Sequence, residues 1–200
     1  AETIILATPA YISAQFFVED RIRTPLQSVR YVSVANIALA FEQEAEQLKL
    51  EGSGFLVPRG EPFSITAATW TSIKWPHTAP RGKVLIRAYL GRENGEDLLH
   101  LNDEELVSLS LRELKEIVGL NQKPLFYHVN RWPQAMPQYQ IGHVERLDAL
   151  KHHLQTLYPG IYLCGAGYRG VGIPDCIAQG KEAASEAITF LQAVQRPARV

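Results

Sequence analysis

The sequence has 200 residues, of which 46% are hydrophobic and 20% charged, and its formal net charge is -1. These values are ordinary for a soluble globular protein, and the length allows one large domain or two small ones. The absence of a basic run argues against a nucleic-acid partner, and no apolar run approaches the roughly 20 residues that span a bilayer.

The chain opens on an apolar run from Thr3 to Ala7, which is typical of a buried parallel strand in an α/β sheet. Such a strand needs neighbours from earlier in a chain, so we expect an N-terminal part to be missing. Residues 10–30 mix helix and loop signals. The run from Tyr31 to Phe41 is β-rich, and residues 42–51 are polar and interpreted as a surface excursion.

Short apolar segments separated by proline and glycine then predict an antiparallel meander, with strands at 54–58, 64–71 and 83–90. The run Asn102 to Glu105 predicts the start of a helix that continues to about Val118. The remaining elements are predicted as a strand at 124–129, a proline-rich connector at 131–142, a helix at 144–157, and a final strand, turn and helix.

The predicted architecture is composite, α/β plus α+β. An antiparallel sheet with helices occupies residues 10–125. Residues 1–9 and 126–200 carry α/β elements that we expect to pack together in a second domain.

The last strand runs into a glycine-rich bend, in the sequence IYLCGAGYRGVGIPDCI, and a helix opens at Pro174 and Asp175. Glycines permit close approach, and a helix N-terminus favours an electron-rich group. The spacing does not fit G-x-G-x-x-G, and no Walker lysine is present, so a flat guest with a polar edge is predicted. The alternative is that the glycines only permit tight packing of strand against helix.

The segment YRGVGIPDCIAQGKEAA resembles the C-terminal flavin-contacting segment of protoporphyrinogen and coproporphyrinogen oxidases, within the flavin amine oxidase-like superfamily. The segments GSGFLVPRGE, TWTSIKWPHTAPRGKVLIRAYLGR and NRWPQAMPQYQIGH support the resemblance. It implies an FAD-linked oxidoreductase fold, of which this chain is a C-terminal fragment. The fragment would hold the antiparallel-sheet substrate domain and part of the FAD-binding α/β domain, without the N-terminal half that grips ADP.

The resemblance implies that Gly170, Val171, Gly172 and Ile173 bind the flavin ring and that Trp132 lies near it. An amide-rich helix start would stabilise negative charge on a reduced flavin. A tryptophan in a loop is otherwise a packing anchor or a surface lid, so that interpretation of Trp132 stays open.

Two strand residues, Leu56 and Tyr89, match positions that line the tetrapyrrole cavity in relatives, although apolar strand residues are usually plain core. A porphyrinogen is a large, mostly apolar ring with carboxylate arms, which suits an apolar pocket with basic residues at its rim. Arg59, Arg87 and Arg92 are candidates for such cations, and each also fits an ordinary solvated face.

The resemblance therefore implies FAD-dependent oxidation of a porphyrinogen, coproporphyrinogen III or protoporphyrinogen IX, with dioxygen as acceptor. No metal site and no catalytic acid, base or nucleophile is predicted, and Cys164 and Cys176 form no CxxC motif and indicate a reducing cytoplasm. Peripheral membrane contact or another haem-pathway enzyme is a further candidate interaction. One alternative is an amine oxidase or carotenoid desaturase; amine oxidation usually uses an aromatic cage at the flavin, for which Trp132 is the one strong candidate and Tyr139 and Tyr168 are weaker ones. The other alternative is a non-catalytic tetrapyrrole-binding or docking fragment.

Overall fold

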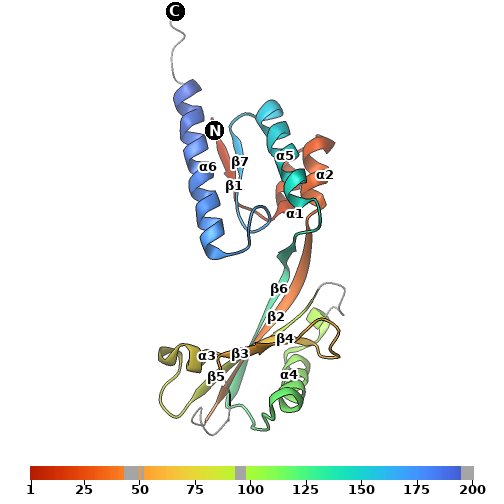
Figure 1. Cartoon of the computed structure of the whole chain (residues 1–200), viewed down its shortest axis with the longest axis vertical. Helices are drawn as coiled ribbons and strands as arrows, with labels where there is room; N and C mark the ends of the chain where they lie inside the picture. The colour runs from red at the N-terminus through yellow and green to blue at the C-terminus, as the bar shows by residue number, and fades with distance from the viewer. Residues whose placement is uncertain (43–49, 51, 93–97, 195–200) are drawn as a thin grey trace, which may run out of the picture. The chain divides into compact units, whose positions relative to one another are not determined.

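The computed structural model describes residues 1–42, 50, 52–92 and 98–194 (Figure 1). The chain divides into two compact units, each described by itself below. Unit 1 consists of Ala1–Tyr31 and Met136–Val200, and unit 2 of Val32–Ala135. The predicted surface excursion at 42–51 falls almost wholly outside the described residues.

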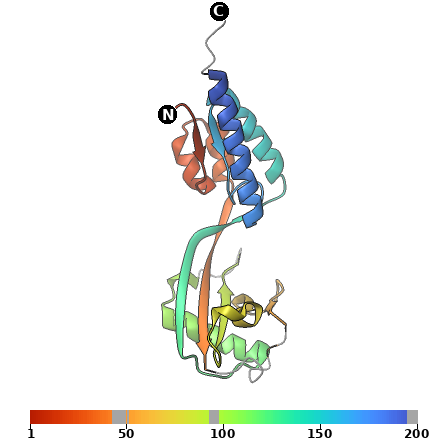
Figure 2. The same ribbon diagram turned by 90° about the vertical axis from the view of Figure 1, so that its left-hand side faces the viewer.

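Unit 1 is built on two parallel strands from the two ends of the chain, β1 (Ile4–Leu6) and β7 (Ile161–Leu163). The parallel pairing predicted for the opening strand is confirmed, but its predicted burial is not, since Ile4 and Ile5 are exposed. Helix α6 (Ile173–Val194) lies on one side of the pair, and α5 (His143–Leu157) lies on the other (Figures 1 and 2). Because helices cover both faces, the strand sequences are apolar throughout instead of alternating.

Residues 10–31 pack with the termini of the chain, whereas the sequence boundary was expected after residue 9. They form α1 (Ala10–Ser13), a 3-10 turn (Ala14–Phe16) and α2 (Asp20–Gln27). The fully buried Ile22 and Leu26 join Leu150 and Leu154 of α5 in one apolar cluster. This shared core explains the shift of the boundary, because burying these side chains stabilises α2 only beside α5.

Unit 2 contains a five-stranded sheet in the order β3-β4-β5-β2-β6. Its strands are β2 (Arg30–Phe41), β3 (Gly54–Leu56), β4 (Ile65–Trp70), β5 (Val84–Leu90) and β6 (Phe126–Gln138). The pairs β3–β4, β4–β5 and β5–β2 are antiparallel, which confirms the predicted meander. In β5 buried and half-buried residues alternate strictly, so one face meets the core and the other does not.

The helix α4 (Asp103–Val118) covers the core face of this sheet through Leu106, Val107 and Leu114. Its predicted start is confirmed by a capping box, in which Glu105 N donates to Asn102 Oδ1 at 2.9 Å and Asn102 N donates to Glu105 Oε2 at 2.8 Å. Shorter elements are α3 (Thr71–Lys74) and 3-10 turns at Pro76–Thr78 and Leu98–His100.

The strand β6 corrects one prediction, since a connector was expected over residues 131–142 and the strand continues to Gln138. The sheet order places β6 at an edge, where a proline need not donate a ladder hydrogen bond. Pro133 and Pro137 are therefore compatible with the strand. Between them Gln134 has a φ of 45°, and its N–H donates to Ser33 Oγ at 3.0 Å.

Candidate functional site

The predicted cofactor residues Gly170, Val171, Gly172 and Ile173 form one continuous stretch that leads into α6. Cys176 N donates to Gly172 O at 2.9 Å, so the helical hydrogen bonds begin at Gly172. The first N–H groups of a helix have no acceptor within it. Val171 and Ile173, which flank these amides, are 58% and 77% exposed. The stretch therefore presents backbone donors beside exposed apolar side chains, which fits a flat ring with a polar edge.

Part of the glycine pattern has a packing explanation. Gly170 has a φ of 132°, and a Cβ there would lie 2.7 Å from the Cβ of Asp175. A Cβ on Gly167 would lie 2.4 Å from the hydroxyl of Tyr31. At Gly167 the added Cβ would clash only with the end of the Tyr31 side chain. At Gly170 the bend itself requires glycine, which is a packing role of the kind that the alternative interpretation held. That requirement fixes the backbone path which leaves Val171 and Ile173 at the surface.

The hydroxyl of Tyr139 braces the bend from the segment that follows β6. It donates to Ala166 O at 2.5 Å and accepts from Gly170 N at 2.9 Å. Desolvation by burial raises the pKa of Tyr139, and the hydrogen bond from Gly170 N opposes that shift. The phenol therefore stays protonated, and its one O–H can donate to the carbonyl while its oxygen accepts from the amide.

A second brace stands beside the first. The ring of His143 stacks on Tyr139 with centroids 4.2 Å apart, and its Nε2 lies 2.8 Å from Tyr168 O. Tyr168 is buried, and its hydroxyl lies 2.9 Å from Ser13 Oγ. Burial raises the pKa of Tyr168 to about 12. The bend is thus held at Ala166, Tyr168 and Gly170 by side chains from three other segments.

These braces were not found from the sequence. Tyr139 was weighed only as a face of an aromatic cage, and His143 was not singled out. Their partners are backbone atoms about 25 residues away, such as Tyr168 O for His143. Aromatic and histidine residue types give no signal for such a partner, since any backbone carbonyl can accept the bond.

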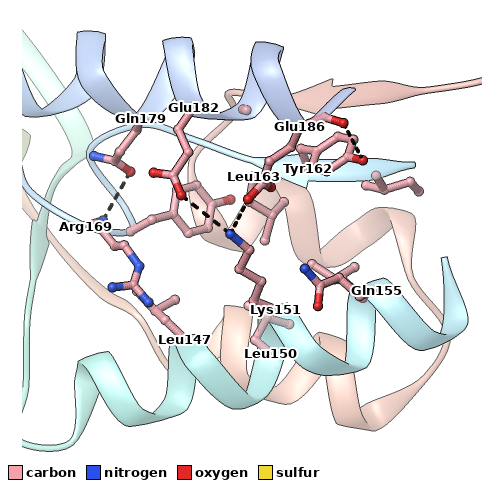
Figure 3. A pocket seen from close by; sticks show the side chains of 14 residues that line it. Leu147, Leu150, Lys151, Gln155, Tyr162, Leu163, Arg169, Gln179, Glu182 and Glu186 are labelled. Atoms are coloured by element: carbon pink, nitrogen blue, oxygen red, sulfur yellow. Dashed lines mark hydrogen bonds and ion pairs between the residues drawn. The ribbon is translucent and has the colours of Figure 1, made fainter. Parts of the chain in front are cut away.

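A groove that is partly open to solvent runs along β7 between α5 and α6 (Figure 3). Its floor includes all of β7, Ile161–Leu163, and Leu147 and Leu150 of α5. Lys151 reaches across from α5 and pairs with Glu186 of α6 at 2.6 Å. That hydrogen bond is the main cause of the raised pKa of Lys151.

The free edge of β7 opens into this groove. Ile4 N donates to Gly160 O at 2.9 Å and Cys164 N to Leu6 O at 3.1 Å. Alternate residues of a parallel strand bond to opposite neighbours, so the peptide groups of Leu163 face away from β1. A strand edge whose peptide groups pair with no described residue is suited to accept one more strand.

In unit 2 the predicted substrate residues Leu56 and Tyr89 lie on one face of the sheet. Both pair with Ala67 of β4, and Tyr89 pairs with Asn36 of β2 on its other side. This face is opposite to α4, because the buried residues of β5 alternate with Tyr89. Leu56 is 83% exposed, so it is not the core residue that the alternative interpretation expected.

Trp132 is also in unit 2, on the edge strand β6, where it is 55% exposed. Trp132 is therefore not part of the described core of unit 2. Among the described residues no group of histidine, cysteine or acidic side chains is arranged to hold a metal ion, and Cys164 and Cys176 are free thiols.

Comparisons with known proteins give one consistent result. The family described as flavin containing amine oxidoreductase matches residues 1–188. The chain is 42% identical to coproporphyrinogen III oxidase of Bacillus subtilis over 96% of its length, and 38% identical to that of Staphylococcus aureus over 94%. It spans only 41% and 40% of these curated relatives.

A crystal structure assigned as a protoporphyrinogen oxidase of Exiguobacterium sp. 255-15 superposes with a TM-score of 0.85 at 33% identity. The match covers 96% of this chain and 42% of that one. The fold described above is therefore the fold of the corresponding part of a flavin oxidoreductase.

Replacing Gly170 by alanine is expected to destabilise the protein by about 1–3 kcal/mol, because a φ of 132° strains an L-residue and the new Cβ would strike Asp175. Gly180→Ala is the matched control, since Gly180 lies inside α6 with no atom within 4 Å of its added Cβ. That variant should gain about 0.5–1 kcal/mol. Urea unfolding measures both, and equal effects would contradict the account of the bend.

Replacing Tyr139 by phenylalanine should cost about 1 kcal/mol and speed hydrogen exchange at the Gly170 amide, because both backbone groups of the brace lose their partner. Tyr11→Phe serves as the control, as the Tyr11 ring packs edge-on against Tyr31 and its hydroxyl bonds to no described residue. An unchanged exchange rate of the Gly170 amide in the Tyr139 variant would contradict the proposed role of Tyr139 in holding the bend.

Proposed function

The chain belongs to the family of flavin-containing amine oxidoreductases, and on that premise we propose that it is the C-terminal part of an FAD-dependent porphyrinogen oxidase of haem biosynthesis. The observation that carries the proposal is the exposed, donor-bearing bend at Val171–Ile173. It lies in the segment whose resemblance to porphyrinogen oxidases is most specific.

The bend residues are suited to hold a flavin ring, because backbone donors lie beside two exposed apolar side chains. The Gly172 and Ile173 amides would donate to the pyrimidine edge, and Val171 and Ile173 would contact the ring. Donors fixed in advance stabilise negative charge more than solvent does, since no reorganisation is needed. When bound, FAD would supply the two-electron oxidation chemistry, with dioxygen as the final acceptor. The chain itself orients and stabilises, and no residue is proposed as a base.

The substrate is proposed to be coproporphyrinogen III, with protoporphyrinogen IX as the second candidate. The face of the unit 2 sheet opposite to α4 is suited to contact a large apolar ligand, because Leu56 and Tyr89 lie on either side of the small Ala67 in one row. Trp132 is proposed to contact the flavin from β6. We propose that the enzyme is cytoplasmic, and peripheral contact with a membrane is a further candidate interaction. No described helix has the length and apolar character needed to cross a bilayer.

The part of the family chain that these residues do not cover is proposed to complete unit 1. A strand from that part, carrying the ADP-binding turn, would pair with the free edge of β7 in the groove between α5 and α6 (Figure 3). A two-stranded parallel sheet is otherwise too small to be stable by itself.

Two other functions remain on the same scaffold. An amine oxidase or desaturase would share the flavin site, but amine oxidation usually uses an aromatic cage, for which Trp132, Tyr139 and Tyr168 were the candidates. Tyr139 and Tyr168 are engaged in bracing the bend, which favours the porphyrinogen substrate. A non-catalytic module would bind a tetrapyrrole without flavin.

The full-length protein is expected to be yellow, to contain FAD, and to produce fluorescent porphyrin and hydrogen peroxide when coproporphyrinogen III and oxygen are supplied. Absorbance, porphyrin fluorescence and a peroxide assay measure this. A colourless protein inert towards both porphyrinogens would contradict the proposal. Peroxide release with amines alone would favour the amine oxidase.

Strand addition at β7 has its own test by hydrogen exchange. The amide of Leu163 should exchange fast in the 200-residue chain and slowly once the N-terminal part of the protein is present. The Cys164 amide is the internal control, because it already donates to Leu6 O at 3.1 Å. Fast exchange at Leu163 in the complete protein would exclude the added strand.

A further inference from the structure

Arg87 lies on the same sheet face as the proposed substrate residues. It is two positions before Tyr89 on β5, and side chains two apart on a strand point to the same side, roughly 7 Å from each other. Its partners in the register are Ala38 of β2 and Thr69 of β4, and Thr69 in turn pairs with Gly54. On the face opposite to α4, the strand position of Arg87 is therefore flanked by small residues.

The Arg87 side chain is held in place without being neutralised. Its Nε donates to the buried Thr71 Oγ1 at 3.1 Å, and its guanidinium carbon lies 5.8 Å from the centre of the Trp75 ring. Lys74 Nζ lies 4.7 Å from the same ring. An indole ring stabilises cations through its face but carries no negative charge. Two positive charges thus converge on Trp75.

Three other cations of unit 2 are engaged by protein groups. Arg131 pairs with Asp103 and Lys83 with Glu42. Arg92 donates to Phe63 O at 2.9 Å and to Ile65 O at 3.4 Å. By contrast, within residues 52–92 and the rest of the described chain, no carboxylate pairs with Arg87, and its two terminal nitrogens donate to no protein group.

We infer that Arg87, assisted by Lys74, binds a carboxylate arm of the macrocycle that rests on Leu56 and Tyr89. A guanidinium with both terminal nitrogens free presents the parallel pair of donors that a carboxylate accepts. Thr71 and Trp75 fix its orientation in advance, which lowers the entropic cost of binding. The inference rests on the proposed function and extends it to a specificity-determining residue. Arg92 is not part of this site, because its guanidinium already donates to backbone carbonyls.

The test uses the full-length protein and titrates coproporphyrin III by fluorescence. Arg87→Gln should weaken binding about tenfold or more, the usual effect of losing a charge-assisted hydrogen bond. It should raise KM for coproporphyrinogen III by a similar factor, with kcat changed much less. Binding of coproporphyrin III methyl ester, which has no carboxylate, should be unaffected. Arg112→Gln, the same change at an exposed residue of α4 on the opposite face, should alter none of these values.

Two further variants test the inference if Arg87→Gln folds poorly. Lys74→Gln, at an exposed position, should weaken coproporphyrin binding about twofold to threefold. Arg87→Lys should bind less tightly than the unaltered protein but more tightly than Arg87→Gln, because lysine keeps the charge and loses the paired donors. Equal binding by the Arg87→Gln and Arg112→Gln variants would overturn the inference, as would an equal loss for acid and ester. If the unaltered protein binds no porphyrin at all, the proposed function fails instead.

Discussion

The shape of the candidate site depends on one hydroxyl group. Tyr139 joins Ala166 O and Gly170 N, two backbone groups on opposite sides of the bend, and so fixes the direction in which the chain enters α6. His143 fixes the carbonyl between them, that of Tyr168. Without these contacts a glycine-rich bend would sample many conformations, since glycine restricts the backbone least. Donors that must be ordered on binding would stabilise a charged ring far less than donors already in place.

Unit 1 brings together segments that are distant in sequence. Its helices therefore depend for their stability on contacts with those distant segments. β1 and β7 are more than 150 residues apart, and each offers only three residues to the pair. Most stabilisation comes from the cluster of α2 and α5. A further strand on β7 would bury its half-exposed residues, Ile161 and Leu163, and pair the groups that face the groove.

Local signals in the sequence were sufficient for much of the fold. The alternation of VLIRAYL predicted a strand with one buried face, and Asn102 with Glu105 predicted the helix start, because both depend on neighbouring residues alone. The length of β6 was missed, because prolines normally end a strand and only its edge position permits them. The bend was found through its glycines. Its braces were missed, since they depend on which distant backbone atoms the fold brings to Tyr139 and His143.

The arginines illustrate the same limit more sharply. Arg87 and Arg92 are five residues apart, belong to one predicted segment, and were equivalent candidates for a rim cation. Tertiary structure separates them. Arg92 donates to two carbonyls near the start of β4, whereas the terminal nitrogens of Arg87, beside an aromatic ring, donate to no group in the described part of the chain. A cation that is positioned but not paired carries a desolvation cost that a ligand carboxylate would offset. Binding capacity in this unit therefore follows from what the fold leaves unpaired, and residue type alone could not reveal it.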